Sequence, residues 1–303
     1  MKHAILITAH DNTSVVRTLM RMLDDVRFVF YLLVDKKSNY EVSDFIPELQ
    51  NAKIVVVDRV RINWGGYSQI EAQLRLLELA LRDEPDYLHY VQGADLPLKS
   101  SEEIDKFFEL NAGDLYIDVS SAPDAFANYK VYCKHYFTNN PYFRTNKFVK
   151  VLDHGIAHLY KPFIKRKSER NPLYAGSALW SIPADFGRFV VCRINEIKKK
   201  YSHSLAADEV FMQTLLMESQ YKEKLSVYGG ARLIDWKHRD GNSPKTFTIK
   251  DKRVLADAIV NPNFMFARKF SESKDMEIIY YLEDEIINKS INKSTYDNIE
   301  RGN

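Results

Sequence analysis

The feature that most constrains the fold of this chain is a series of short apolar runs near its beginning. Residues 4–8, 27–34 and 53–57 are rich in β-branched or aromatic side chains, which is typical of strands covered on both faces. Between the first two runs lies 12–25, whose apolar positions have helical spacing. The order strand, helix, strand predicts a parallel sheet in an α/β protein.

The same alternation continues along the chain. Residues 67–82 hold the strongest helical pattern, and Ser68 with Glu71 has the spacing of a capping box at its start. We expect a strand at 87–92, a loop at 93–97, and further regular structure at 101–110, 114–119, 177–182, 184–200, 207–219, 254–260 and 276–288. The sequence therefore predicts one domain over residues 1–290, with a mostly parallel, Rossmann-like central sheet, followed by a frayed tail at 291–303.

The segment 120–172 interrupts this pattern. It is rich in Tyr, Phe, Asn and Pro, and we expect an irregular insertion there. Long irregular segments inside compact folds are often functional. The insertion ends in a basic cluster, Lys161–Arg170, which is interpreted either as a solvated face or as a docking patch for anionic lipid or a lipid-linked acceptor.

Composition excludes some classes of function. A formal net charge of +2 argues against a nucleic-acid binder that depends on bulk charge. Two cysteines, Cys133 and Cys192, cannot form a disulfide framework, and they fit a reducing compartment. No stretch approaches the roughly 18 apolar residues that span a bilayer, and the apolar run at 4–7 is too short for a signal peptide. We expect a cytoplasmic protein, with peripheral contact at the inner face of the membrane left open.

Several nucleotide-binding and catalytic motifs are missing from the sequence. There is no G-x-G-x-x-G, no G-x-x-x-x-G-K-[ST] and no G-x-S-x-G, and no Cys/His spacing suits zinc. Asp-x-Asp, through which many nucleotide-sugar enzymes hold a divalent metal, is also missing. If the protein handles a diphosphate, Lys and Arg are the simplest groups to neutralise it.

Four segments taken together resemble the core-2/I-branching glycosyltransferases, a family that includes the protein xylosyltransferases. They are Leu33–Ser38 (LVDKKS), Asn63–Ser68 (NWGGYS), Gly93–Leu98 (GADLPL) and Phe266–Phe270 (FARKF). Each tag alone is weak, but their order and spacing follow the family over about residues 4–270. The sequence departs from the family pattern at Leu33, Gln92, Leu96 and Ala207, where the family usually has His, Ser, Tyr and Pro.

This resemblance implies a GT-A-like fold and an inverting, metal-independent transfer without a cofactor. The donor would be a UDP-sugar, with N-acetylglucosamine as the expected sugar, and the acceptor a hydroxyl of a glycan or lipid-linked saccharide in polysaccharide biosynthesis. The family's membrane anchor and disulfides are missing, which implies a cytoplasmic, bacterial version. Two alternatives stay open: a UDP-xylose donor, and a carbohydrate- or nucleotide-binding protein that has lost catalysis.

The resemblance also assigns roles to individual residues. Glu209 would be the general base, against the simpler interpretation of an acidic residue at a helix start. Arg268 and chiefly Lys269 would bind the diphosphate, and Lys245 would add a further cation. The remaining candidates are Asp35, Trp64, Gly65 and Gly66 on the donor side and Asp95, Asp208 and Trp236 on the sugar and acceptor side.

For several of these residues a structural role stays open beside the functional one. Asp35 either meets the uridine or caps its own loop. Trp64-Gly65-Gly66 either forms a tight turn into a helix or lets the backbone approach the donor. Asp95 either binds sugar hydroxyls or forms a turn. Trp236 either stacks on a sugar or packs in the core.

Overall fold

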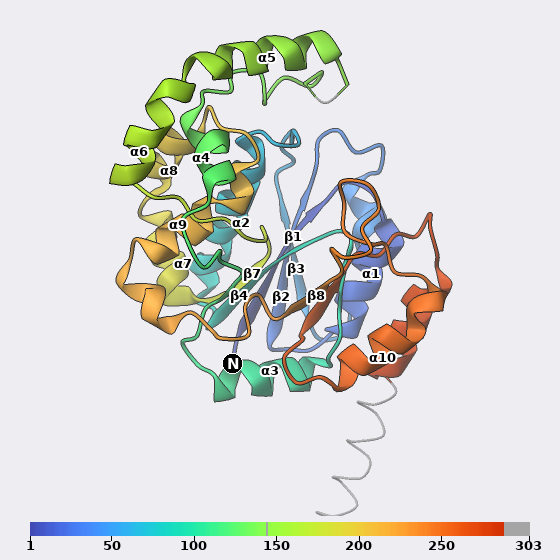
Figure 1. Cartoon of the computed structure of the whole chain (residues 1–303). Helices are drawn as coiled ribbons and strands as arrows, with labels where there is room; N and C mark the ends of the chain where they lie inside the picture. Colours follow the sequence, from blue (N-terminus) through green and yellow to red (C-terminus); the bar gives the residue numbers. More distant parts are fainter. Residues whose placement is uncertain (144, 288–303) are drawn as a thin grey trace, which may run out of the picture.

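The computed structural model describes residues 1–143 and 145–287, and its centre is a six-stranded sheet (Figure 1). The strand order is β3-β2-β1-β4-β7-β6. The first four strands in this order are parallel, and the last two pair antiparallel. The strands are β1 (His3–Ala9), β2 (Phe28–Val34), β3 (Lys53–Val57), β4 (Tyr87–Gln92), β6 (Tyr116–Ile117) and β7 (Trp180–Pro183).

Both faces of this sheet are buried, as its apolar runs predict. On β1, Ile5 and Ile7 pack into one core and Ala4 and Leu6 into the other, because successive side chains of a strand point to opposite faces. One core is covered by α1 (Thr13–Met22), α3 (Ser101–Leu110) and α10 (Lys252–Val260). The other is covered by α2 (Ser68–Ala80), α7 (Ala184–Val191), α8 (Ile194–Tyr201) and α9 (Phe211–Met217). This arrangement confirms the predicted α/β class, with a mostly parallel, Rossmann-like central sheet flanked by helices.

A small second sheet was not predicted. Its order is β5-β9-β8, with β5 (Asp95–Pro97), β8 (Arg232–Ile234) and β9 (Phe266–Arg268). The prediction of a loop over 93–97 is therefore wrong for its last three residues. Buried Arg232 joins the two sheets, since its Nη2 donates to the carbonyl oxygens of Tyr90 at 3.2 Å and Trp180 at 2.7 Å. Burial lowers the pKa of Arg232 to about 10.

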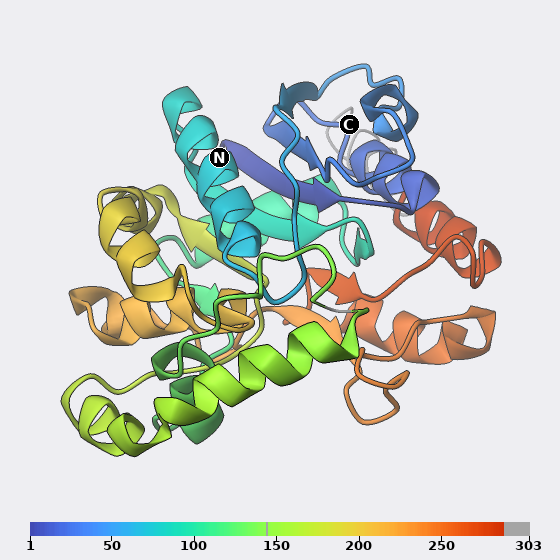
Figure 2. The ribbon, with the colours of Figure 1, turned by 90° about the horizontal axis from the view of Figure 1, so that it is seen from above.

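The prediction of an irregular insertion over 120–172 is also wrong. The segment contains three helices, α4 (Ala125–Tyr132), α5 (Lys147–Leu159) and α6 (Ile164–Arg170). Figure 2 shows α5 as a separate rod in front of the sheet. The buried side of α5 carries Asp153 and Ala157, and not a stripe of large apolar residues, so the usual inward-facing pattern is missing.

Some predicted helix boundaries also change. Ser68 does not cap α2 but is its first residue, and its Oγ accepts a hydrogen bond from the backbone N–H of Asn63 at 2.8 Å. The predicted helix 184–200 is two helices, α7 and α8, and 207–219 is the 3₁₀ turn η4 (Ala207–Glu209) followed by α9. The last predicted helix is seen over 277–287, and the tail 291–303 lies outside the described residues. In the parts of the chain that are described, no helix is long and apolar enough to cross a bilayer.

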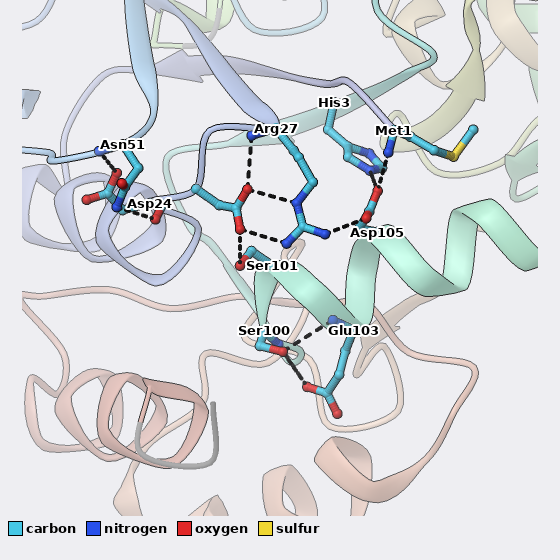
Figure 3. Close-up of polar contacts among 10 residues, drawn as sticks. Met1, His3, Asp24, Arg27, Asn51, Ser100, Ser101, Glu103 and Asp105 are labelled. Atoms are coloured by element: carbon cyan, nitrogen blue, oxygen red, sulfur yellow. Dashed lines mark hydrogen bonds and ion pairs between the residues drawn. The ribbon is translucent and has the colours of Figure 1, made fainter. Parts of the chain in front are cut away.

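A polar network fastens α3 beneath the amino end of β1 (Figure 3). Asp105 Oδ1 accepts from the Met1 amino group at 2.7 Å and contacts His3 Nε2 at 3.0 Å, while its Oδ2 accepts from Arg27 Nη1 at 2.5 Å. Ser100 caps the helix, since its Oγ accepts from the backbone N–H of Glu103. Burial lowers the pKa of His3 to about 4. Figure 1 shows this end of the sheet opposite α5.

Candidate active site

A cleft of about 310 Å³ opens where β1, β2 and β4 end. Its walls come from the loops after these strands, from the segment that leads into α2, and from β9. The carboxyl ends of parallel strands are the usual place for a ligand in an α/β sheet. The lining residues are Thr8, Ala9, His10, Asp11, Asn12, Asp35, Lys37, Ile62, Trp64, Gln69, Gln92, Gly93, Ala94 and Arg268.

Arg268 is the cation that β9 places at this cleft. Its Nη1 donates to Asp95 Oδ1 at 2.6 Å, and its Nη2 donates to Gln92 Oε1 at 2.6 Å. Asp95 is buried, and its second oxygen accepts from the backbone N–H of Gln92 at 2.8 Å. Asp95 therefore holds the guanidinium in a fixed direction. Its carboxylate lies behind Arg268 and is absent from the residues that line the cleft.

Tyr90 links the basic and acidic parts of the site. Its hydroxyl forms a hydrogen bond with Thr8 Oγ1 at 2.9 Å. Burial raises the pKa of Tyr90 to about 12, and the charges of both Asp208 and Arg268 act on its hydroxyl. Both charged side chains therefore lie in the neighbourhood of this phenol. The fold thus brings together residues that are 60 positions apart in the sequence.

Asp208 is a buried carboxyl beside the cleft. Gln69 lines the cleft, and its Nε2 donates to Asp208 Oδ2 at 3.0 Å. Burial, followed by the negative charge of Glu209, raises the pKa of Asp208 to about 7. This group therefore exchanges its proton near neutral pH, which is a property often found at functional sites.

Glu209, the predicted base, has a different environment. It ends η4, its side chain is 43% exposed, and Lys130 Nζ donates to its Oε2 at 2.7 Å. Lys130 comes from α4 of the insertion and also lies over the Phe126 ring at 4.7 Å. The ion pair gives the Glu209 carboxylate a defined direction. Glu209 does not line the cleft. It is connected to the cleft through the preceding residue, Asp208, whose carboxylate binds Gln69 on the cleft wall.

The Trp64-Gly65-Gly66 turn connects the cleft to η4. Gly65 has φ +75°, which favours glycine, and its carbonyl accepts from the backbone N–H of Ala206 at 2.7 Å. A Cβ on Gly66 would lie 2.9 Å from the carbonyl oxygen of Thr138, in the insertion. The structure thus explains why both positions are glycine: Gly65 adopts a positive φ in a tight turn, and Gly66 packs closely against the backbone of Thr138. Trp64 is exposed and lines the cleft.

Asp35 both caps its loop and faces the cleft. Its Oδ1 accepts from the backbone N–H groups of Lys37 at 2.9 Å and Ile62 at 3.2 Å. Its Oδ2 lies 3.6 Å from His10 Nδ1 and 3.6 Å from Lys37 Nζ. One oxygen is therefore engaged by the loop, while the other belongs to a polar group on the wall of the cleft.

Of the remaining predicted residues, Trp236 and Lys245 lie on the loop that follows β8, and Lys269 directly follows β9. Lys245 and Lys269 are neighbours, since the backbone N–H of Lys269 donates to the Lys245 carbonyl at 3.4 Å. Lys245 Nζ is engaged by Asp251 Oδ1 at 2.6 Å. Lys269 has no ion-pair partner among residues 1–143 and 145–287. Trp236 is exposed, and none of these three lines the cleft, so the structure places them beside it and not in it.

Several polar residues of this site were not predicted, and three of them hold predicted side chains in place. Gln92 orients Arg268, Gln69 binds Asp208, and Lys130 binds Glu209. Gln92 had one signal, since it stands at a position where the family motif has another residue. Gln69 and Lys130 had none, because their partners are far away in the sequence. Among the side chains that the structure describes, no three His, Cys, Asp or Glu are grouped to hold a metal ion.

Comparison with known proteins gives one match over most of the chain. A sequence model described as Core-2/I-Branching enzyme matches residues 4–256. No curated protein matches the chain significantly. Among solved structures, mouse xyloside xylosyltransferase 1 in its apo form has a TM-score of 0.39 at 11% identity, over 88% of this chain and 96% of that one.

Two further solved structures are similar over shorter parts. The S. cerevisiae mannosyltransferase Ktr4p has a TM-score of 0.33 at 12% identity, over 68% of this chain and 67% of that one. S. aureus TarS 1–349 in complex with UDP-GlcNAc has a TM-score of 0.26 at 16% identity, over 39% of this chain. The alignment spans 34% of that TarS chain, about a third of its length. At these TM-scores the structures carry no argument about function, so the family match is the finding that does.

Proposed function

The chain belongs to the core-2/I-branching enzyme family of glycosyltransferases, and from this premise we propose that it transfers a sugar from a UDP-sugar to a hydroxyl of a glycan or lipid-linked saccharide. The observation that carries the proposal is the cleft at the strand ends, with Arg268 fixed on its wall and the Asp208–Glu209 pair beside it. A transferase of this kind needs positive charge for the departing diphosphate and a base for the acceptor hydroxyl.

Arg268 and Lys269 supply the positive charge in this proposal. Asp95 and Gln92 hold the Arg268 guanidinium in place, so little entropy is lost when it binds an anion. Lys269 is the residue that follows Arg268, and it has no ion-pair partner in the described ranges. Its ammonium group is therefore available to bind a second phosphate. Lys245 contributes more weakly, because its ammonium group is engaged by Asp251 and does not line the cleft, whereas Arg268 lines the cleft beside its contact with Asp95. Asp95 acts by positioning Arg268 and not by binding a sugar.

The transfer proceeds without a metal ion in this proposal. Two adjacent cations neutralise the diphosphate in place of a divalent metal, in keeping with a sequence that has no Asp-x-Asp. The protein requires no other cofactor. Displacement by a hydroxyl on the face opposite the leaving UDP inverts the anomeric centre in a single step, with one base to take the proton.

Glu209 is that base, and Asp208 is its partner. The Glu209 carboxylate is open to solvent and held by Lys130, so an acceptor hydroxyl can reach it. Asp208 is buried and bound to Gln69, and its charge state responds to pH near 7. A buried carboxyl of this kind serves to orient the acceptor and to adjust the electrostatic environment of the neighbouring Glu209. A candidate base and candidate cations beside one cleft favour a transferase over the alternative of a non-catalytic binding protein.

The donor sugar is proposed from the family resemblance as N-acetylglucosamine, with xylose as the alternative. The insertion over 120–172 is proposed to form the acceptor side, because its Thr138 packs against Gly66 and its Lys130 binds Glu209. A cytoplasmic location agrees with the exposed free thiol of Cys192, which a reducing compartment keeps unpaired.

Calorimetry of UDP binding in EDTA tests the role of the cations. Wild-type protein is expected to bind UDP, and Lys269→Ala is expected to bind it about ten- to a hundred-fold more weakly, the usual effect of removing a charged hydrogen-bond donor from a phosphate. Lys274→Ala is the matched control, since Lys274 is an exposed lysine five positions further along the chain. Equal affinities for the two variants would contradict the assignment of Lys269.

A further inference from the structure

Helix α5 is unusual because four of its large apolar side chains are exposed. Phe148, Val151 and Leu159 are 74%, 70% and 72% exposed, and Leu152 shares their side of the helix. At 100° per residue these positions fall on one face. Phe163 continues the exposed apolar surface into the turn that follows. We call this set, Phe148, Val151, Leu152, Leu159 and Phe163, the α5 apolar face.

The opposite side of α5 is fixed by polar contacts to the segment 135–137, whose His135 backbone N–H donates to the carbonyl of His203 at 2.9 Å. Asp153 is fully buried, and its Oδ2 lies 2.7 Å from His135 Nδ1. Its Oδ1 accepts from the backbone N–H of Phe137 at 3.0 Å. A helix that buries an aspartate and exposes phenylalanine has the reverse of the usual pattern. The buried pair therefore determines which way α5 faces, and the apolar side is presented outward.

Positively charged residues flank the α5 apolar face in the sequence, at the start of the helix and after its end. The segment 147–170 contains seven Lys or Arg residues and two Asp or Glu residues, and one of these acidic residues is the buried Asp153. The whole chain has a formal net charge of only +2, so the rest of it is net acidic. The cations are concentrated at one place, and Lys147, Lys161, Lys165, Arg166 and Arg170 are exposed there.

An exposed apolar helix face edged by lysine and arginine is the signature of a helix that lies in a membrane interface. We propose that α5 docks the protein on an anionic lipid bilayer, with the α5 apolar face among the acyl chains and the 147–170 cations on the headgroups. A second copy of the chain fits this face less well, because pairing would bring two sets of like charges together.

The position of α5 relates this docking to the cleft. Figure 1 shows α5 at the end of the molecule toward which β1 runs, and the cleft lies at the carboxyl ends of β1 and β4. A protein docked through α5 therefore turns its cleft end toward the bilayer surface, where a lipid-linked acceptor would be presented. The docking itself does not depend on the transfer reaction, so it is tested without donor or acceptor.

Vesicle binding tests the proposal. We expect the wild-type protein to bind phosphatidylcholine vesicles that contain about a third phosphatidylglycerol, and not to bind vesicles of pure phosphatidylcholine. Binding to the anionic vesicles should be lost at high salt. Phe148→Ser/Leu159→Ser should weaken binding about ten-fold or more. Lys161→Glu/Lys165→Glu should weaken it about twenty-fold or more, from the loss of attraction at two sites.

Matched controls come from the far side of the molecule. Leu110 ends α3 and is 75% exposed, so Leu110→Ser removes an equally exposed leucine. Lys250→Glu/Arg253→Glu reverses two exposed charges, one in the turn before α10 and one in its first turn. Both controls should bind like wild type, and all variants should keep the wild-type melting temperature. The proposal is overturned if wild type ignores the anionic vesicles, or if the α5 variants bind like the controls. It is equally overturned if wild type forms a dimer that Phe148→Ser/Leu159→Ser dissociates and vesicles play no part.

Discussion

Asp208 and Glu209 are adjacent in the chain and lie in opposite environments. Asp208 is buried against Gln69, and Glu209 is exposed and paired with Lys130. The difference separates two roles that a sugar transferase requires, a group that accepts the proton and a group that organises its surroundings. Only a contact made by folding distinguishes the two carboxyls, since the sequence shows them merely as neighbours at the start of an apolar run.

Burial of the Asp208 carboxyl should lower the free energy of unfolding at neutral pH. Because the pKa of Asp208 is raised from 3.8 to about 7, the folded state binds this proton more tightly than the unfolded state does, and stability is lost as pH rises from about 4 to about 7. Asp208→Asn removes the ionisation and can still accept from Gln69. We expect it to stabilise the protein, by about 2 kcal/mol more at pH 8 than at pH 5.

Urea unfolding of wild type and Asp208→Asn at the two pH values checks this expectation. The quantity that matters is the change in the difference between the two proteins, so any constant effect of the substitution cancels. A difference that stays the same at pH 5 and pH 8 would show that Asp208 keeps an ordinary pKa in the folded protein.

At the scale of elements, the sequence predicts best those segments whose faces are both buried or clearly divided. The strands β1 and β2 are continuous apolar runs, and α1 and α2 have apolar stripes that face the sheet. The strands β5, β8 and β9 are three residues long, which is too short for a periodic pattern. The helix α5 was missed because its apolar face points outward and its buried face contains Asp153.

The attachment of α3 to β1 should make stability depend on pH in the opposite sense to Asp208. Burial lowers the pKa of His3 from 6.5 to about 4, so this residue stays neutral in the folded protein while the unfolded chain takes up a proton (Figure 3). Stability is therefore lost as pH falls from about 6.5 to about 4. Asp105, whose pKa is lowered to about 2, loses its contribution only below about pH 4, so it does not obscure this window.

The variant His3→Gln isolates this effect. Between pH 7 and pH 5 the wild type should lose about 2 kcal/mol of unfolding free energy through His3, and His3→Gln should lack that part of the decline. Denaturant titrations at the two pH values measure both. Parallel declines in the two proteins would mean that burial does not lower the pKa of His3 in the folded protein.

At the scale of the whole molecule, the candidate site was predictable in its parts but not in its connections. The tags around Asp35, Trp64 and Arg268 were recognisable in the sequence, and the fold places these three residues on one cleft. The contacts that define the chemistry, such as Gln69 with Asp208, join residues 139 positions apart. No local pattern encodes such a pair, because it depends on how α2 and η4 meet through the Gly65 turn.

The division of the molecule into two ends follows from the parallel sheet. The carboxyl ends of the strands carry the cleft, Arg268 and the carboxyl pair, and the opposite end carries the network of His3 and Asp105 that anchors α3 (Figures 1 and 3). We therefore expect changes at the cleft to alter binding and turnover, and changes at the opposite end to alter stability alone.

The most direct test of the central claim is the release of UDP from a UDP-sugar with an acceptor, measured in EDTA at saturating substrate for wild type and Glu209→Gln. The account predicts that wild type keeps its full turnover in the chelator. Glu209→Gln should lose about a hundred-fold or more, the usual contribution of a placed general base, with its UDP affinity and melting temperature unchanged. Turnover that vanishes in EDTA and returns with manganese, or a Glu209→Gln rate within a few-fold of wild type, would contradict it.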